Sequence, residues 1–503
     1  MRRLIHLVIP CLLLSGCFGP GEGVEVPVNE IYFPVGMAVD KDAEHLFVVS
    51  SDFDLQYNGG SIQSFDLEDL YAELPVRCTE DADCNDGQLC QQGMCAAQGK
   101  SPCPSGDRED ASRLLYPGRC NPIEIPTFDR VKIGAFATDA IIRERPDSAP
   151  KDPDAPERLF VPVRGDSTLH WLDVKNGKLE CGQAGSSDGS CDDQHRAGDD
   201  PTKNSRGLEL NVEPFAIDAD AGGNTIVVTN QTTGTASLFL NESWDSKGPQ
   251  LSFELSGNGI PRLAVGIASL PQPLAPGEVA NPYSTYMMTF RNAAQVRLIR
   301  FAPDDLSPVN SPRPYLVDGY GVGIEANSVG TDSRGIALDA AARKKAKDAC
   351  AAGDTTCADA AALVPIDVYV ANRAPSSLLI GRTRPPQEYP YFYQSVALTT
   401  GPSRVVVGHV TTPEGEDETR VFVACFDSRR IFVYDPQRAR IETEILTGRG
   451  PHAMTVDTQR QLLYVGHFTD SYVGVYSLDL AHPATYGTML GTLGTPKSPR
   501  ASK

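Results

Sequence analysis

The amino-acid sequence predicts an all-β protein, and within that class a seven-bladed β-propeller built from four-stranded antiparallel blades. Short runs rich in Val, Ile, Tyr, Phe and Thr alternate with turn residues, in a chain of 503 residues that holds 45 glycines and 39 prolines. Similar groups of runs return seven times along the chain, as expected for a ring of repeated sheets. Apolar residues hardly recur at helical spacing.

The clearest copy of the repeat spans residues 450–480, where three strand-like runs are separated by polar or glycine-containing turns. The first strands of the seven copies begin at Pro34, Gly134, Pro214, Pro261, Ser333, Pro402 and Pro451. The closest starts, Pro214 and Pro261, are 47 residues apart, about the size of one four-stranded blade. The longer intervals therefore predict insertions.

The second strand of the repeat carries a recognisable motif. It reads YVAN at Tyr369–Asn372 and VVTN at Val227–Asn230. This resembles the motif of the YVTN-type seven-bladed propellers, and the resemblance covers about residues 30–495. It implies a fold but no chemistry, because the repeat residues of that family pack the blades. Residues 24–32 or residues 488–493 are expected to supply the strand that closes the ring.

The insertions are predicted to thicken one face of the ring. They fall between first and second strands at 143–157, 271–283, 340–364 and 411–418, and between third and fourth strands at 68–120 and 175–206. Both kinds of connection leave an up-and-down blade on the same side. The alanine-rich insertion at 340–364 is predicted to be helical.

Cysteine usage indicates an oxidising compartment. Ten cysteines are disulfide candidates: Cys78, Cys84, Cys90, Cys95, Cys103, Cys120, Cys181, Cys191, Cys350 and Cys357. The first six lie in the insertion at 68–120, which resembles short cysteine-rich modules in secreted proteins of myxobacteria and their relatives; fifteen pairings are open. No CxxC pair or histidine lies between Cys78 and Cys120, so no zinc site is expected. Cys425 is expected to be a small buried side chain.

The N-terminus is laid out like a secretory leader. Arg2 and Arg3 precede an apolar segment at 4–14, and Leu14-Ser15-Gly16-Cys17 resembles the bacterial lipobox. The resemblance implies a signal peptide at 1–16, lipidation of Cys17 and a tether at 17–29. Phe18 stands where an aspartate would retain such a protein in the inner membrane, so an outer-membrane lipoprotein is expected, facing the periplasm or the cell surface. Residues 496–503 are expected to be a flexible tail.

Charge and motifs narrow the function. The net charge of −20 disfavours a nucleic-acid partner. The match to GxSxG at 185–189 lies in a polar loop with no strand before it, so it does not form a nucleophile elbow. Neither HExxH nor a phosphate-binding glycine loop occurs, and no metal or cofactor is expected.

The opening turns of the first strands should meet at one mouth of the central channel. Four cationic or titratable side chains are expected there: Arg262, Arg334, Arg404 and His452. Together they could hold a carboxylate or phosphate ligand. The alternative is that they are ordinary loop side chains paired with neighbouring acids.

The function favoured by the sequence is that of a binding or scaffold module, with a protein or an envelope polymer as its partner and a lipid contact with the membrane. The alternative is a lactonase-type or quinoprotein-type enzyme that acts on a small anionic substrate at the channel mouth. An enzyme needs convergent acids, bases or metal ligands, and the aligned first strands supply no carboxylate at the mouth positions. The sequence leaves the oligomeric state open.

Overall fold

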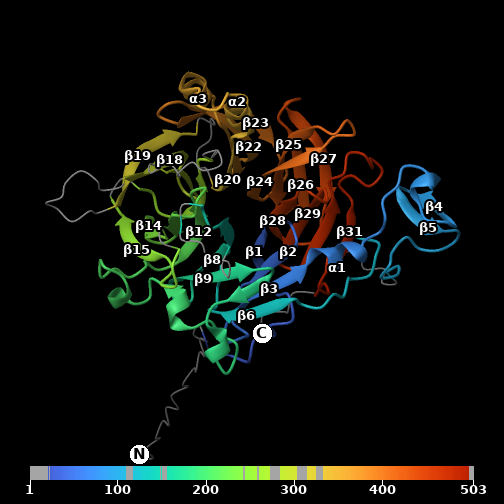
Figure 1. Cartoon of the computed structure of the whole chain (residues 1–503), viewed down its shortest axis with the longest axis horizontal. Helices are drawn as coiled ribbons and strands as arrows, with labels where there is room; N and C mark the ends of the chain where they lie inside the picture. The colour runs from blue at the N-terminus through green and yellow to red at the C-terminus, as the bar shows by residue number, and fades with distance from the viewer. Residues whose placement is uncertain are drawn as a thin grey trace, which may run out of the picture.

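The computed structural model describes residues 21, 23–108, 117–147, 149, 156–241, 244–257, 260–271, 284–302, 314–324 and 332–497. Seven antiparallel sheets surround a common axis in these residues, each with its first strand innermost (Figure 1). The predicted all-β, seven-bladed architecture is confirmed. Cys17 and the predicted signal peptide lie outside the described residues.

Each blade takes its strands in chain order. Blade 1 contains β1 (Pro34–Val39), β2 (His45–Ser50), β3 (Gly60–Asp66) and β6 (Asp129–Ile133); blade 2 contains β7 (Ile141–Glu144), β8 (Glu157–Val163), β9 (Thr168–Lys175), β10 (Lys178–Glu180) and β11 (Arg196–Ala197). Blade 3 contains β12 (Pro214–Ala219), β13 (Thr225–Asn230), β14 (Thr235–Leu240) and β15 (Gln250–Leu255); blade 4 contains β16 (Ala264–Ser269), β17 (Thr285–Phe290), β18 (Gln295–Ala302) and β19 (Tyr315–Gly323). Blade 5 contains β20 (Ser333–Asp339), β21 (Asp367–Arg373), β22 (Ser376–Arg384) and β23 (Tyr389–Ala397); blade 6 contains β24 (Pro402–Thr411), β25 (Asp417–Cys425), β26 (Arg430–Asp435) and β27 (Arg440–Leu446). Blade 7 contains β28 (Pro451–Asp457), β29 (Leu462–His467), β30 (Tyr472–Ser477) and β31 (Met489–Leu493).

The hydrophobic core is divided among the interfaces between blades. Seven buried clusters each join two neighbouring blades; one, for example, packs Phe47 and Val49 of blade 1 against Leu159 and Val161 of blade 2. The second strands of blades 1, 3 and 7 are buried along their whole length because both of their faces are covered. This explains why they read as continuous apolar runs.

One backbone contact recurs in every blade. A residue at or just after the end of the second strand donates its N–H to the carbonyl of a residue before the first strand. The acceptor directly precedes that strand in six blades, and in blade 2 it is Phe136, five residues before β7. The donor–acceptor pairs are Ser51–Phe33, Arg164–Phe136, Gln231–Glu213, Arg291–Leu263, Arg373–Asp332, Phe426–Gly401 and Phe468–Gly450, at 2.7–3.2 Å. Six of the seven acceptor residues have positive φ, which is costly for all but glycine. The contact fixes how each blade enters and leaves the channel mouth.

The ring closes between blades 7 and 1 without sharing strands. All four strands of blade 7 come from the C-terminal end, and β31 (Met489–Leu493) is its outer strand. Of the two segments expected to supply this strand, residues 488–493 therefore do so, and residues 24–32 do not. β31 is itself covered: Ile123 donates its N–H to the carbonyl of Thr492 (2.7 Å) and bridges Leu493 in parallel. The chain that leaves the cysteine-rich insertion therefore clasps blade 7 to blade 1.

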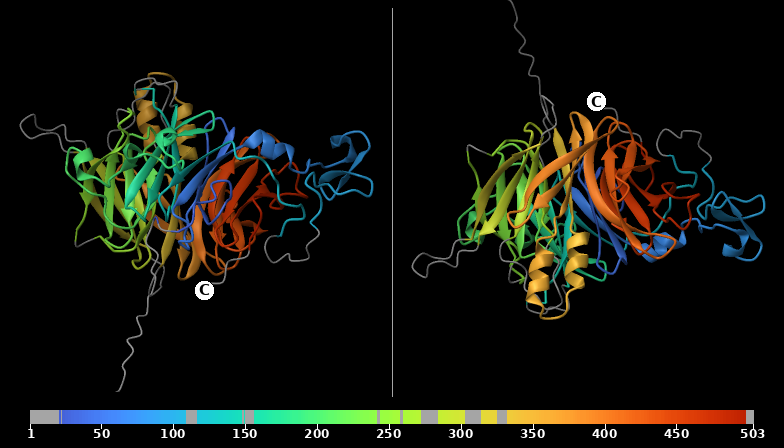
Figure 2. Two further views of the ribbon diagram at one scale, coloured as in Figure 1. Left: turned by 90° about the horizontal axis from the view of Figure 1, so that it is seen from below. Right: turned by 90° about the horizontal axis from the view of Figure 1, so that it is seen from above.

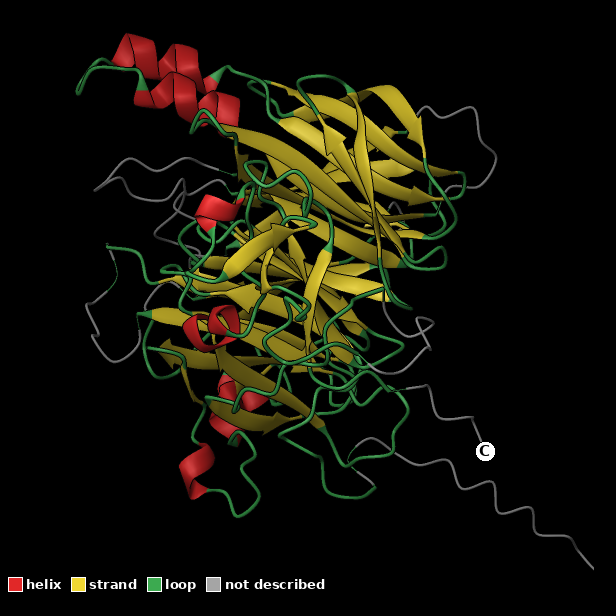
Figure 3. Cartoon of the chain, turned by 90° about the vertical axis from the view of Figure 1, so that its right-hand side faces the viewer, coloured by secondary structure: helices red, strands yellow, loops and turns green. Residues whose placement is uncertain are grey.

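The described helices lie on one side of the sheets (Figure 3). Helices α2 (Ala341–Asp348) and α3 (Thr355–Ala362) connect β20 to β21, as predicted for 340–364, and stand on this face as a pair joined by Cys350–Cys357 (Figure 2). Buried Arg343 holds α2 to blade 5 through Glu388 (2.8 Å). We call this side the helix face and the opposite side the mouth face.

The cysteine-rich insertion leaves blade 1 between β3 and β6 and contains α1 (Leu67–Ala72), η1 (Asp81–Asp83), β4 (Gln88–Gln91) and β5 (Met94–Ala97). Its disulfides are Cys78–Cys90, Cys84–Cys95 and Cys103–Cys120, which selects one pairing from the fifteen. The β4–β5 hairpin projects sideways beyond blade 7 instead of covering a face (Figures 1 and 2). Arg77 anchors it to Asp479 of blade 7 (3.4 Å).

Blade 2 departs from the expected layout in two places. Its first strand begins at Ile141 rather than near Gly134; before it, Ala137 pairs with Val163 of β8 through an isolated bridge. The insertion at 175–206 does not separate the third and fourth strands: both β10 and β11 pair with β9, so the insertion splits the fourth strand. It contains η2 (Gln183–Gly185), η3 (Asp193–His195) and η4 (Pro201–Lys203), and is closed by Cys181–Cys191.

No helix in the described part of the chain has the length and apolar content needed to cross a bilayer. The remaining unpaired cysteine of these residues, Cys425, is fully buried in β25, and burial raises the pKa of its thiol to about 11.

The interface between blades 2 and 3 depends on one buried guanidinium. Arg158 lies 4.3 Å from the ring centre of Trp171 and 5.4 Å from that of Trp244. It donates to Asp173 (2.8 Å) and to Asn241 (2.8 Å), and its side chain is fully buried. Its charge is therefore compensated on every side.

We expect Arg158→Met to lower the free energy of unfolding by about 3 kcal/mol, because it removes a fully buried cation from Asp173 and leaves the buried side-chain oxygen of Asn241 without its donor. Urea denaturation followed by tryptophan fluorescence measures the change. The matched control is Arg382→Met, which removes a half-exposed arginine from Asp367 and should cost under about 1 kcal/mol. Equal losses in the two variants would contradict the role given to Arg158.

Candidate functional site

The mouth face is where the turns between second and third strands meet the starts of the first strands. Both groups of residues face the channel there, because the recurring backbone contact holds them side by side. The mouth contains a cavity of about 160 Å³. That is about the volume that accepts one benzene-sized group in a protein interior.

The cavity is walled by aromatic side chains, and we call it the phenylalanine cup. Its lining comprises Phe53, Phe136, Phe215, Phe426, Phe468, His452, Val35, Ser51, Ala137, Thr138 and Arg164. Phe468 lies centrally, with ring centroids 5.1 Å from Phe53 and 6.3 Å from Phe426. Phe53 is 51% exposed, so the cup opens to solvent. An exposed aromatic cluster of this kind is typical of a binding surface.

Backbone strain positions part of the cup. Phe33, Asp52 and Phe136 have φ values of 45°, 51° and 60°, a region that side-chain-bearing residues rarely occupy. Asp52 is fully buried beneath the turn that carries Phe53, and burial raises the pKa of its carboxyl to about 7. Strained residues cluster at sites where the surrounding structure holds them for a function.

His452 contributes an uncharged ring to the cup. Desolvation, followed by the guanidinium groups of Arg404 and Arg334, lowers its pKa to about 3. Its ring centroid lies 6.0 Å from that of Phe468. At neutral pH it is therefore part of the nonpolar wall and not a cation.

The hydroxyl groups in the cup bond to the backbone. Ser51 Oγ donates to the carbonyl of Ala137 (2.8 Å), and Thr138 Oγ1 donates to the carbonyl of Phe215 (2.6 Å). Neither hydrogen bond involves His452. The charged member of the lining, Arg164, is paired with Glu213 (2.7 Å). The lining therefore presents mainly nonpolar surface rather than a nucleophile paired with a base.

The arginines predicted for the mouth are not gathered into one cationic ring. Arg334 pairs with Asp332 through two contacts of 2.5 and 2.7 Å, and Arg404 crosses the channel to Asp139 through contacts of 3.0 and 2.7 Å. Arg262 is exposed at the start of blade 4. For Arg334 and Arg404 the structure thus shows the paired arrangement that was the alternative at the sequence level.

Two further arginines stand beside Arg334. Arg291 follows β17 and approaches Asp332 at 3.9 Å, and Arg373 ends β21 and pairs with Asp427 at 2.7 Å. Their positions match those of Phe426 and Phe468 in blades 6 and 7, directly after or at the end of the second strand. We call Arg291, Arg334 and Arg373 the arginine sector.

A second cavity, of about 1140 Å³, opens on the helix face between the first strands of blades 2 to 6 and helix α2. Its charged side chains are mostly engaged with each other: Arg143 contacts Asp218, and Asp339 accepts a hydrogen bond from Thr419 (3.1 Å). The pair Asp139–Arg404 lies between this cavity and the cup. Thr138, the neighbour of Asp139, lines the cup, and Val405, the neighbour of Arg404, lines the cavity on the helix face.

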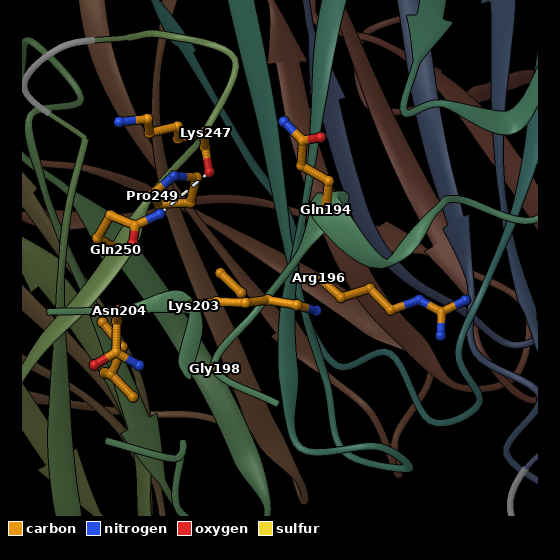
Figure 4. A pocket seen from close by; sticks show the side chains of 10 residues that line it. Gln194, Arg196, Gly198, Lys203, Asn204, Lys247, Pro249 and Gln250 are labelled. Atoms are coloured by element: carbon orange, nitrogen blue, oxygen red, sulfur yellow. Dashed lines mark hydrogen bonds between the residues drawn. The ribbon is translucent and has the colours of Figure 1, made fainter. Parts of the chain in front are cut away.

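A third pocket, of about 310 Å³, lies at the rim between the split fourth strand of blade 2 and β15 (Figure 4). The side chain of Lys203 crosses it, with its ammonium group on the carbonyl of Asp193 (2.9 Å) and on Asp199 (3.2 Å). The guanidinium of Arg196 points out of it towards the carbonyl of Cys191 (3.0 Å). The cations therefore line the pocket with their aliphatic parts.

Most of the cup was missed at the sequence level because the residues were aligned on the first strand. Aligning the chain on the end of the second strand gives Ser51, Arg164, Gln231, Arg291, Arg373, Phe426 and Phe468 in turn. This register places phenylalanines in blades 6 and 7 and arginines in blades 4 and 5. A further arginine, Arg164 of blade 2, lies in the lining of the cup and is paired with Glu213 (2.7 Å). Of the residues aligned with His452, Val35 and Phe215 also reach the cup.

Comparison with known proteins supports no family assignment. No family model and no curated protein matches the chain, so the resemblance to the YVTN-type propellers and to the myxobacterial modules stays a prediction. Among solved structures, the chain is similar to a putative 6-phosphogluconolactonase from Bacteroides fragilis (11% identity, 84% of this chain and 87% of that one, TM-score 0.44). It is also similar to a periplasmic gluconolactonase from Pseudomonas aeruginosa (13%, 83% and 86%, 0.43) and to hydrazine synthase from Kuenenia stuttgartiensis (9%, 91% and 98%, 0.45). These values are too low for an activity to be carried over.

The lowered pKa of His452 makes stability depend on pH. The unfolded chain takes up this proton near pH 6.5 and the folded chain only near pH 3, so stability should be lost as the pH falls between these values. Between pH 6.5 and pH 4.5 we expect the free energy of unfolding of His452→Phe to fall by about 2 kcal/mol less than that of the wild type. Urea denaturation at both pH values provides the measurement.

His467 supplies an internal comparison for this experiment. It is fully buried against Tyr472, and burial lowers its pKa to about 3 as well. It remains in His452→Phe, so the variant should keep part of the pH dependence. An unchanged difference between the two pH values would show that His452 titrates normally.

Proposed function

We propose that this protein is a non-enzymatic binding module, anchored to the outer membrane through Cys17, which receives a nonpolar group of an envelope partner in the phenylalanine cup. The observation that carries the proposal is the cup itself: five phenylalanines and an uncharged histidine around a cavity of about 160 Å³ that is open at the channel mouth. Burial of one aromatic ring there would contribute about 2 kcal/mol.

The surrounding groups favour binding over catalysis. The two hydroxyls of the lining donate to backbone carbonyls, and the cations nearest to His452 are Arg404 and Arg334, which hold carboxylates. A binding site needs no further groups, whereas a hydrolase would need a base or a metal directed at the same point.

The N-terminal segment favours a particular orientation of the anchored protein. Val24 pairs with Tyr57 in the same turn of blade 1 that carries Phe53. Cys17 precedes Val24 by seven residues, which span at most about 25 Å when extended. A lipid on Cys17 would therefore keep the mouth face within this distance of the membrane.

Indole is a suitable probe of the cup, because it is aromatic and uncharged. We expect wild-type protein to bind it saturably in the millimolar range, and Phe53→Ala to bind it at least about fivefold more weakly. The affinity is measured by NMR titration. The matched control is Phe128→Ala, since Phe128 is 45% exposed but lies beside His45, away from the mouth. Absence of saturable binding by the wild type would refute the cup as a binding site.

The anchor is tested separately. We expect Cys17→Ala to move the protein from the membrane fraction to the soluble fraction, because lipid attachment is the proposed membrane contact. Cys11→Ala, which removes a cysteine of the same leader, should leave the protein with the membranes. Retention of the Cys17→Ala protein in the membrane fraction would rule out the lipid anchor.

A further inference from the structure

The mouth of the channel is divided into two chemically distinct sectors. Blades 6, 7, 1, 2 and 3 contribute the side chains of the phenylalanine cup. Blades 4 and 5, which complete the circle, contribute the arginine sector at the corresponding positions of the repeat. The two sectors meet at blade 6, where Phe426 belongs to the cup and the next residue, Asp427, pairs with Arg373.

The arginine sector has more positive than negative charge. Its three guanidinium groups face two carboxylates, Asp332 and Asp427, which leaves one positive charge without a partner among these side chains. Arg291 is the least satisfied member: it is 39% exposed and reaches Asp332 only at 3.9 Å. Desolvation and the neighbouring Arg334 also lower its pKa, as expected for a cation beside another cation.

A nonpolar receptacle and an unbalanced guanidinium at the same channel mouth suit an amphiphilic anion. Guanidinium groups bind carboxylates through paired hydrogen bonds, and they do so best where water is partly excluded. We propose that the mouth binds an aryl or alkyl carboxylate, with its nonpolar end in the phenylalanine cup and its carboxylate on Arg291 and its neighbours in the arginine sector. The assignment rests on the proposed binding function of the cup and names the chemical class of the ligand.

The probes for this inference are a series of phenyl-substituted acids, from benzoate through phenylacetate and 3-phenylpropionate to 5-phenylvalerate, each compared with the alcohol of the same length. The series allows the distance between cup and arginines to be found by experiment. Affinities are measured by NMR titration at low and at high salt. We expect one acid to bind about tenfold more tightly than its alcohol, and the preference to decrease with salt.

The deciding variant is Arg291→Gln, because this side chain can be replaced without removing a close ion-pair partner. It should reduce the preference for the acid to about threefold or less and leave binding of the alcohol unchanged. Arg119→Gln is the matched control: it removes an exposed arginine of the lateral cysteine-rich module, paired with Asp107, and should preserve the preference.

The possible results separate the two proposals. If the alcohols bind and no acid binds better than its alcohol, the carboxylate assignment is overturned and the cup remains a binding site. If neither acids nor alcohols bind to the wild type, both proposals are overturned. The comparison of acid with alcohol on wild-type protein tests the carboxylate assignment even if a variant fails to fold.

Discussion

The structure depends on one backbone hydrogen bond that is repeated in all seven blades. It joins the end of the second strand to the segment that leads into the first, and in six blades the acceptor occupies a left-handed conformation. Glycine meets this demand easily in blades 6 and 7, whereas Phe33 and Phe136 meet it at a cost in backbone energy. The contact brings two points of each blade to the channel mouth, and it thereby decides which side chains a ligand can meet.

Each blade depends on its two neighbours in the ring to bury its apolar side chains. Each hydrophobic cluster belongs to an interface between two blades, so no blade has a complete core of its own. The cysteine-rich insertion adds Leu67, Leu70, Leu74 and Ile123 to the cluster between blades 7 and 1. Insertions on the helix face or at the rim are closed by disulfides and leave the mouth free.

Charge is distributed unevenly in this acidic protein. The cations near the channel are held by carboxylates, as in the pair Arg404–Asp139, and the cup beside them is nonpolar. Arg291 is the exception, because it is 39% exposed and reaches Asp332 only at 3.9 Å. In the anchored protein that we propose, this two-sided mouth lies on the face from which the tether emerges, so a ligand that partitions to the membrane surface would meet it first.

The sequence by itself determined the number of blades, the order of their strands and the cysteines available for disulfides, because alternating short runs and a repeated second strand are properties of local chain segments. It also led to His452, which the structure places in the cup. It did not determine the pairing of Cys78, Cys84, Cys90 and Cys95, nor the split fourth strand of blade 2, since these depend on how distant segments meet. The charge state of the mouth was likewise decided only by tertiary structure: Arg404 finds Asp139 across the channel, 265 residues away in the chain, and the phenylalanines converge because the ring closes.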